Sequence, residues 1–371
     1  ITVADIRAGS PDGTDTLIGI TMINFSDNQI KVGNLPISNL SFSQTNINLG
    51  INGSWPHKIT TYDLNGDGYQ DILVGCEFSK SIAIYTNNKD GTFIFNKSLQ
   101  SNHAMFKPIV SDLLNNGIKS IVASGGNTVS IFTPDSSGNY VEKQLVGDRS
   151  SYGVAVSDTN GDGYPDIITS SNVFKNNKDG TFTKSFTFTS HGDGNDVIAG
   201  DLNGDGLADV LISNDGGTAD LYKNNGDGTF SGPLSFGQGI KIATLADVNG
   251  DGSKDIVTSN ADGTASIFSN DGKGNFSLLK TVTVGNAPGY IQIGDLNNDG
   301  INDIVVADQS GNPLSYVLGN KDGSYSSPIY PDGAKFSYGF ALSDINNDGK
   351  LDIITANAQD NSISIYTNSG I

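Results

Sequence analysis

The chain has 371 residues, a net charge of −19, a single cysteine and no run of basic residues. The lone Cys76 excludes a disulfide framework, and the lack of a basic run argues against nucleic acid or an anionic membrane surface as partner. No apolar run reaches the ~18 residues of a membrane-spanning helix, so we expect no membrane insertion.

The first 50 residues resemble a worn copy of a unit that recurs later in the chain. Residues 2–5 suit a first strand, 12–15 a distorted loop, 17–23 a second strand, 29–33 a third and 40–49 a fourth. We interpret 1–50 as a degenerate repeat, with ring-closing strands as the alternative. The start at Ile1, with neither Met nor a signal peptide, leads us to expect a processed or trimmed product.

The stretch DLNGDGYQD at 63–71 is the best-defined part of this unit. The pattern D-x-N-x-D-G-x-x-D returns at 158–166, 201–209, 247–255, 295–303 and 344–352, and a worn copy lies at 112–120. The leading Asp residues fall at 63, 112, 158, 201, 247, 295 and 344, a mean period of about 47 residues. A fixed period of this size indicates a repeat architecture.

The composition of this loop predicts a calcium site. Positions one, three, five and nine offer side-chain oxygens, position seven offers a backbone carbonyl, and the Gly at position six permits a sharp turn. Position twelve is apolar or small and the flanks read as strands, so the loop is not an EF-hand. The predicted ligands are Asp63, Asn65, Asp67, Tyr69, Asp71, Asp158, Asn160, Asp162, Tyr164, Asp166, Asp201, Asn203, Asp205, Leu207, Asp209, Asp247, Asn249, Asp251, Ser253, Asp255, Asp295, Asn297, Asp299, Ile301, Asp303, Asp344, Asn346, Asp348, Lys350 and Asp352.

About six calcium ions are therefore expected, and we expect them to be structural. The worn loop has Leu114, Asn116 and Ser120 at ligand positions, so it should bind no calcium tightly. The competing interpretation is a set of Asn/Asp/Gly turns without metal. Three carboxylates in one tight loop would then repel each other with no cation between them.

Four short strands surround each loop and predict a β-propeller. Examples are a first strand at 153–157, a second at 303–307, an alternating third at 81–85 and a fourth at 182–188. The third and fourth are joined by a nearly fixed N-x-D-G-T-F turn, as at 88–93, which favours a hairpin. Four-stranded antiparallel blades at this period predict one propeller domain over 1–371, with eight blades favoured and seven as the alternative.

The last unit lacks its fourth strand, because residues 362–368 form a third strand and the sequence stops at the following turn. Either the N-terminal segment supplies the missing strand and closes the ring, or the native chain continues.

The calcium-type loop followed by the N-x-D-G-T-F turn resembles the FG-GAP/VCBS repeat family, clearly over 52–368. The resemblance implies an integrin-α-like propeller with Ca²⁺ between the first and second strands of most blades. Fungal N-acetylglucosamine-binding lectins of this family carry a Gly-Trp-Arg-like motif before most blades, whereas here only Trp55 matches it.

The segments that join one unit to the next vary most in sequence and should lie together on one propeller face. Their aromatic side chains could stack on sugars or anchor a protein partner, and the alternative is packing between blades. The candidate ligand-binding residues are Trp55, His57, Tyr152, Tyr290 and Tyr338.

No catalytic residue is predicted, because no nucleophile, zinc or phosphate-binding motif occurs and His57, His103 and His191 belong to different units. We expect a calcium-stabilised recognition module, secreted or on the cell surface, that binds a glycan or an extracellular protein as lectins and adhesion proteins do. The alternatives are a secreted polysaccharide lyase or hydrolase and a structural segment of a larger surface protein. Convergence of His, Tyr and Asp on one pocket would favour the enzyme.

Overall fold

The structure is a computed structural model that describes residues 2–4, 14–16, 23–24, 29–30, 40–50, 53–189, 193–286, 288–308, 314–331 and 337–370. It divides the chain into two compact units, Ile1–Ser41 with Ser369–Ile371, and Phe42–Asn368. All its named elements are β-strands. In the described part of the chain, no helix is long and apolar enough to span a membrane.

The first unit contains two short antiparallel pairs. β1 (Thr2–Ala4) pairs with β2 (Thr14–Thr16), and β3 (Ile23–Asn24) pairs with β4 (Gln29–Ile30). The distorted loop predicted at 12–15 and the strand predicted at 17–23 lie mostly outside the described residues. The described strands of this unit do not form a four-stranded blade.

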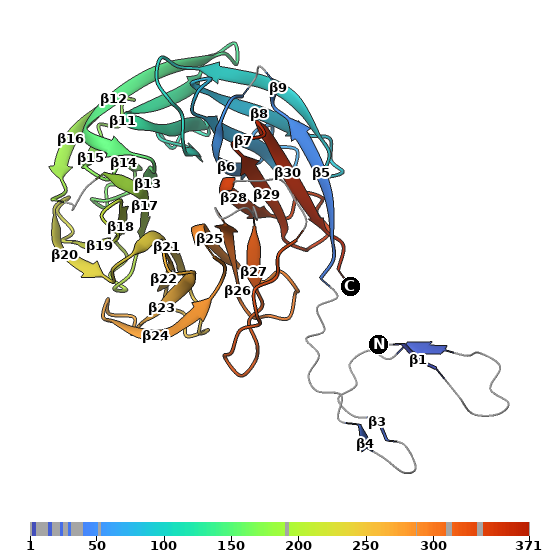
Figure 1. Cartoon of the computed structure of the whole chain (residues 1–371). Coiled ribbons are helices and arrows are strands. Elements are labelled where there is room, and N and C mark those ends of the chain that lie inside the picture. The colour runs from blue at the N-terminus through green and yellow to red at the C-terminus, as the bar shows by residue number, and fades with distance from the viewer. Residues whose placement is uncertain are drawn as a thin grey trace. The chain divides into compact units, whose positions relative to one another are not determined.

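The second unit is a ring of sheets around a central axis (Figure 1). Five sheets stand separately as blades. They are β6 (Pro56–Tyr62), β7 (Asp71–Cys76), β8 (Ser81–Asn87) and β9 (Phe93–Gln100); β13 (Ala155–Ser157), β14 (Asp166–Ile168), β15 (Asn172–Asn176) and β16 (Phe182–Thr187); β21 (Ile240–Ala246), β22 (Asp255–Asn260), β23 (Thr264–Asn270) and β24 (Phe276–Thr283); β25 (Pro288–Gly294), β26 (Asp303–Asp308) and β27 (Ser315–Val317); and β28 (Ser337–Ser343), β29 (Asp352–Asn357) and β30 (Ser362–Asn368) with β5 (Phe42–Asn48).

The remaining strands of the ring are joined in one seven-stranded sheet. Its strands, in spatial order, are β10 (Pro108–Ser111), β11 (Ser120–Pro134), β12 (Tyr140–Ser151), β17 (Gly194–Gly200), β18 (Asp209–Asn214), β19 (Ala219–Asn224) and β20 (Phe230–Phe236). A parallel contact between Ser151 of β12 and Gly194 of β17 joins the two halves.

The propeller architecture is confirmed, but the predicted count of eight blades, with seven as the alternative, is wrong. Five blades are separate sheets, and two groups of strands merge because the long strand β12 reaches the start of β17. Among the described N-terminal residues, β1–β4 form two short pairs and no eighth four-stranded blade. Instead β5 pairs antiparallel with β30 and occupies the fourth-strand position of the last blade, so first and last parts of the ring share one sheet.

The apolar core lies between neighbouring blades. All six residues of β7 are buried, because a second strand is covered on both faces by the adjacent blades. Packing is tight enough that a Cβ on Gly75 would lie 2.1 Å from the backbone oxygen of Phe106. One cluster joins Ile72 and Val74 to Ile354 and Ile363, which closes the ring through apolar contact as well as through strand pairing.

A buried asparagine at the end of the third strand links each of five loops to a neighbouring repeat. Its side-chain amide donates to a carbonyl within its own loop and to the carbonyl of loop position two in the repeat before it. For Asn224 these acceptors are Ala208 (3.0 Å) and Thr159 (2.8 Å). The five asparagines are Asn87, Asn176, Asn224, Asn270 and Asn368.

Asn224→Ala is expected to lower the free energy of unfolding by about 2–3 kcal/mol, because two buried carbonyls lose their donor. The matched control is Asn225→Ala. The exposed Asn225 side chain donates to Thr229 Oγ1 at 3.0 Å, and its removal should cost under ~1 kcal/mol. Urea unfolding of both variants measures the difference, and equal losses would contradict a linking role for Asn224.

Candidate functional site

The first strands of the repeats surround the propeller axis. β28 contacts β6 and β25, β21 contacts β17 and β25, and β10 contacts β6 and β13, so the inner ring is continuous (Figure 1). Side chains at the start of these strands therefore meet at one end of the axis.

A β-bulge at the start of five of these strands selects which side chains face the axis. In β6 the pairing with β7 shifts between Pro56 and Ile59, and similar shifts occur in β17, β21, β25 and β28. A bulge leaves residues unpaired and turns their side chains. The residues inside the shifts are His57, Lys58, Asn195, Lys241, Gly289, Tyr290 and Tyr338.

These bulged residues line a cavity of about 370 Å³, the axial pocket, together with Glu77, Tyr152 and Ile242. His57 forms the centre of an aromatic wall. Its ring stacks on Tyr338 (4.5 Å between centroids, 7° between planes) and lies parallel to Tyr152 (5.9 Å, 8°). Phe106 packs edge-on against His57 at 4.9 Å and supports the stack from behind.

A buried ion triad lies beneath this wall. Asp196 Oδ1 accepts from Lys107 Nζ at 2.8 Å, and Asp196 Oδ2 lies 3.2 Å from Lys58 Nζ. Lys58 also donates to the backbone oxygen of Asn195 at 3.2 Å, and its ammonium lies 5.1 Å from the Tyr290 ring centre. The Lys58 and Asp196 side chains are 5% and 3% exposed, so the charges are almost fully desolvated.

Burial and the neighbouring charges together set the pKa values of the groups in and around the triad. Burial and the nearby Lys58 lower the pKa of His57 to about 3, so its imidazole is neutral at ordinary pH. Burial lowers the pKa of Lys58 to about 8 against the attraction of Asp196. Burial alone would raise the pKa of Asp196, but Lys107 and Lys58 hold it below its usual value. The Asp196 carboxylate is therefore held in ion pairs with Lys58 and Lys107.

The structure brings four of the five predicted ligand residues to the axial pocket: His57, Tyr152, Tyr290 and Tyr338. Trp55 lies at the edge of this pocket, with 6.4 Å between the centroids of its ring and that of Tyr338. Its ring stacks on that of Phe78, which is 61% exposed, with 5.0 Å between centroids. His103 lies elsewhere, bonded to Ser130 at 3.0 Å, and His191 is outside the described residues.

Sequence reasoning missed Lys58, Lys107 and Asp196. Each is the fifth residue before its loop Asp, where other repeats have Gly153, Ile242, Tyr290 or Gly339. A charged residue at this position of an otherwise apolar strand is the sequence feature that could have identified these three residues. The glycines make room for the charges: a Cβ on Gly153 would lie 2.2 Å from Asp196 Oδ1, and one on Gly339 would lie 3.1 Å from Lys58 Cγ.

The loops predicted to bind calcium are held by their own backbone in this structure. In the loop at 63–71, Gly68 N–H donates to Asp63 Oδ2 (2.7 Å) and Tyr69 N–H to Asp67 Oδ1 (3.0 Å). The buried Asp71 accepts from Leu64 N–H and from the backbone of the third strand. Gly68 has φ 89°, as the tight turn requires.

The donor chemistry of these loops fits a calcium ion, although the side chains are not gathered round one point. Among the described residues, no group of three or more His, Cys, Asp and Glu is arranged to hold a metal. The carboxylates nevertheless lie close enough to interact. Burial, together with the nearby Asp295 and Asp299, raises the pKa of Asp303 to about 7. A divalent cation held by oxygen ligands would relieve this repulsion.

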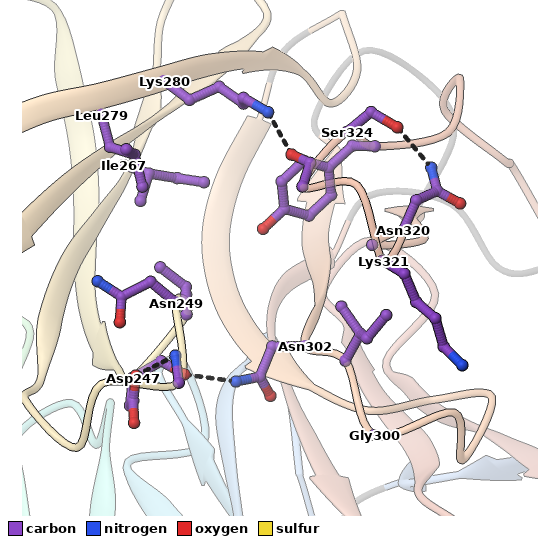
Figure 2. A pocket seen from close by; sticks show the side chains of 16 residues that line it. Asp247, Asn249, Ile267, Leu279, Lys280, Gly300, Asn302, Asn320, Lys321 and Ser324 are labelled. Atoms are coloured by element: carbon purple, nitrogen blue, oxygen red, sulfur yellow. Dashed lines mark hydrogen bonds between the residues drawn. The ribbon is translucent and has the colours of Figure 1, made fainter.

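A second pocket, of about 440 Å³, lies between the sheet of β21–β24 and that of β25–β27. Figure 2 shows hydrogen bonds from its polar side chains, two of which cross the gap to backbone oxygens. Asn302 donates to the backbone oxygen of Asp247 (2.7 Å), Asn320 donates to Ser324 Oγ (3.0 Å), and Lys280 donates to the carbonyl of Gly323. The bonds of Asn302 and Lys280 join two blades, so these polar groups are already paired and offer a ligand fewer hydrogen bonds than the axial pocket does.

Solved structures with the same fold include a lectin and a protein complex. A lectin from Agrocybe aegerita, described for specific recognition of non-reducing terminal N-acetylglucosamine, matches at TM-score 0.52 and 20% identity over 74% of this chain and 80% of its own. BBS1N in complex with ARL6DN, in mercury-soaked crystals, matches at TM-score 0.63 and 10% identity over 89% and 96%. Such identities show the fold alone. No curated protein sequence matches the chain.

A family model, described as FG-GAP-like repeat, matches residues 63–123, 169–212, 201–258, 247–306 and 295–355. These matches cover more than half of the chain and include five of the six calcium-type loops, all but the one at 158–166. The chain therefore belongs to the FG-GAP-like repeat family.

Proposed function

We propose that this protein is a calcium-stabilised, extracellular recognition module that binds a glycan in the axial pocket. The observation that carries the proposal is one concave, aromatic-walled site in which six separate repeats meet. Its volume of about 370 Å³ lies within the usual range for small-ligand sites. Tyr152 is 38% exposed and offers a free ring edge for a sugar.

An unpartnered polar atom supports a ligand at this place. His57 is 9% exposed, and its Nδ1 is buried with no hydrogen-bond partner among the described residues. Buried polar atoms are nearly always bonded, so an atom of this kind in a pocket wall suits a hydroxyl supplied by a ligand. A neutral imidazole can donate to or accept from a sugar hydroxyl.

Calcium and an extracellular location belong to the same proposal. Six loops with three carboxylates each would be held by Ca²⁺ through Asp, Asn and backbone oxygens, as set out for 63–71. Sites of this weak kind fill at the millimolar calcium found outside cells. The ions would lie at the loops between the first and second strands, whereas the axial pocket is built largely by the opposite ends of the first strands.

Tyr152→Ala is expected to weaken glycan binding roughly tenfold, because exposed aromatic anchors carry much of the affinity at such sites. The matched control is Phe95→Ala on the outer strand β9, since Phe95 is 37% exposed and Tyr152 38%. A glycan array in millimolar calcium identifies the ligand, and titration calorimetry compares the variants. Equal affinity in both variants would remove Tyr152 from the site, and a blank array on folded protein would redirect the search to protein partners.

A polysaccharide lyase or hydrolase is a second candidate, because His57, Tyr290 and Tyr338 line one pocket and Asp196 lies beneath it, next to Lys58. The charge states argue for binding instead. Asp196 is bonded to two lysines and His57 has a pKa of about 3, so neither suits proton transfer near neutral pH. Release of reducing ends from any glycan that binds would establish the enzyme, and its lack over a long incubation would support the recognition module.

A further inference from the structure

The floor of the axial pocket is cationic although the whole chain carries a charge of −19. The charged side chains that line it are those of Lys58, Lys241 and Glu77, and the ion pair of Lys107 with Asp196 lies beneath Lys58. Three positive and two negative groups leave one positive charge. The neutral His57 and the phenols of Tyr152, Tyr290 and Tyr338 do not compensate it.

The two buried lysines retain hydrogen-bonding capacity. Lys58 Nζ has two acceptors among the described residues, Asp196 Oδ2 and Asn195 O, and an ammonium has three donors. Lys107 Nζ likewise has Asp196 Oδ1 and Val197 O. Of the two, Lys58 lines the cavity. Among the described residues Lys58 has no third acceptor, and its ammonium lies against the Tyr290 ring, 5.1 Å from the ring centre, at the wall where the pocket meets the triad.

An excess buried charge is costly unless something pairs with it. Apolar residues would fill the space that Lys58 and Lys107 occupy. Instead, the Asp196 carboxylate pairs with both lysines, Gly153 and Gly339 leave room for these side chains, and β6 and β17 each contain a β-bulge. Asp196 alone neutralises one of the two lysines. An anionic group from a ligand would neutralise the other, in a site that excludes water from one side.

We propose that the axial pocket selects acidic sugars that carry a single negative charge, a uronate carboxylate or a sulfate ester, and that Lys58 binds this group. The inference rests on the proposed function, since it names the class of glycan that the same pocket takes. The sugar ring would pack along the wall of His57, Tyr152 and Tyr338, and its hydroxyls would meet His57 Nδ1 and the rim residues Asn195 and Lys241.

The test uses the full, calcium-loaded chain and pairs of ligands that differ only in charge. One arm compares methyl β-D-glucuronoside with methyl β-D-glucoside, and another compares a sulfated oligosaccharide with its desulfated form. On an array, uronate-ending oligosaccharides stand beside neutral ones of the same linkage. The acidic member of at least one pair should bind at least roughly tenfold tighter, as expected for a hydrogen bond to a charged group in a partly dry site.

Lys58→Met should abolish that preference, so that the acidic and the neutral member of each pair bind with equal affinity. Lys107 still neutralises Asp196 in this variant, so the fold retains a paired carboxylate. The matched control, Lys273→Met at an exposed turn, should change affinity less than about twofold. Should Lys58→Met not fold, Lys241→Met tests the same pocket from its rim and should weaken the acidic ligand by roughly threefold.

The pH dependence of the affinity distinguishes a lysine that binds the ligand from one that only stabilises the structure. Burial lowers the pKa of Lys58 to about 8, so the affinity for the acidic sugar should fall as pH rises above about 8, while that for the neutral sugar stays level. Equal affinities within every pair, or an unchanged preference in Lys58→Met, would overturn the inference while leaving glycan binding intact. No binding of any glycan would overturn the proposed function itself, and binding of a carboxylate-bearing peptide in place of every sugar would reassign the pocket to a protein partner.

Discussion

Removal of calcium by excess EGTA is expected to lower the melting temperature of this protein by roughly ten degrees. A site present only in the folded state contributes about 1.4 kcal/mol when calcium is at ten times its Kd, and six such sites contribute about 8 kcal/mol. The ions would replace repulsion among three carboxylates per loop with attraction to one cation. Differential scanning calorimetry in millimolar Ca²⁺ and in EGTA measures the shift.

The worn loop at 112–120 supplies an internal control for this experiment. Asp112 Oδ2 accepts from Gly117 N–H at 2.7 Å, as Asp63 Oδ2 accepts from Gly68 N–H at 2.7 Å. Asp63→Asn and Asp112→Asn should therefore disturb similar backbone bonds. Only Asp63→Asn should also reduce the calcium-dependent part of the melting temperature, by about one sixth if the six sites contribute equally.

An unchanged melting temperature in EGTA would contradict the calcium proposal. The loops would then be turns held by their own hydrogen bonds, which the structure already shows for every carboxylate of the loop at 63–71. The two outcomes differ in mechanism. In one the Asp residues are ligands, and in the other they are acceptors for backbone N–H groups.

The propeller could be predicted from sequence because its repeat is local. The loop, the hairpin turn and the alternating strands each lie within about ten residues, and their period places them in consecutive blades. The number of blades could not be predicted in the same way. It depends on a contact between Ser151 and Gly194 and on the pairing of β5 with β30, across about 320 residues of sequence.

The candidate site was predictable in part for the same reason. The variable segments were expected on one face, and His57, Tyr152, Tyr290 and Tyr338 do meet there. Their binding role remains a prediction. Lys58 and Asp196 were not predicted because they belong to different repeats and contact each other only across the axis. Likewise Asn224 looks like part of a turn until its bond to Thr159 of the neighbouring repeat is seen.

Asp196→Asn is the single substitution expected to damage the folded protein most. The side chain keeps its size but loses the charge that holds Lys58 and Lys107 together at the axis. Two nearly buried ammonium groups would then face each other without a counterion. Breaking a buried ion pair by removing one partner costs about 3–5 kcal/mol, and chemical unfolding in saturating calcium measures this loss.

The pH dependence of this variant separates electrostatics from packing. Asp196 raises the pKa of Lys58 in the native protein, so its loss lowers that pKa further below about 8. The unfolded chain keeps the ordinary lysine pKa and binds more protons than the folded chain over the interval between the two values. The free energy of unfolding of Asp196→Asn should therefore rise with pH in that interval. The difference in this free energy between the variant and the native protein should shrink.

Two further variants decide whether the loss comes from unpaired charge. Asp193→Asn, at an exposed site three residues away, should change stability by less than ~0.5 kcal/mol. Lys58→Met combined with Asp196→Leu and Lys107→Met removes every charge of the triad, and replacement of a buried ion network by apolar residues of similar volume is often neutral or stabilising. If the triple variant regains the stability that Asp196→Asn loses, and also loses acidic-sugar binding, then the triad is needed for ligand binding and destabilises the fold. If the triple variant does not regain this stability, then the triad contributes packing contacts that the propeller needs.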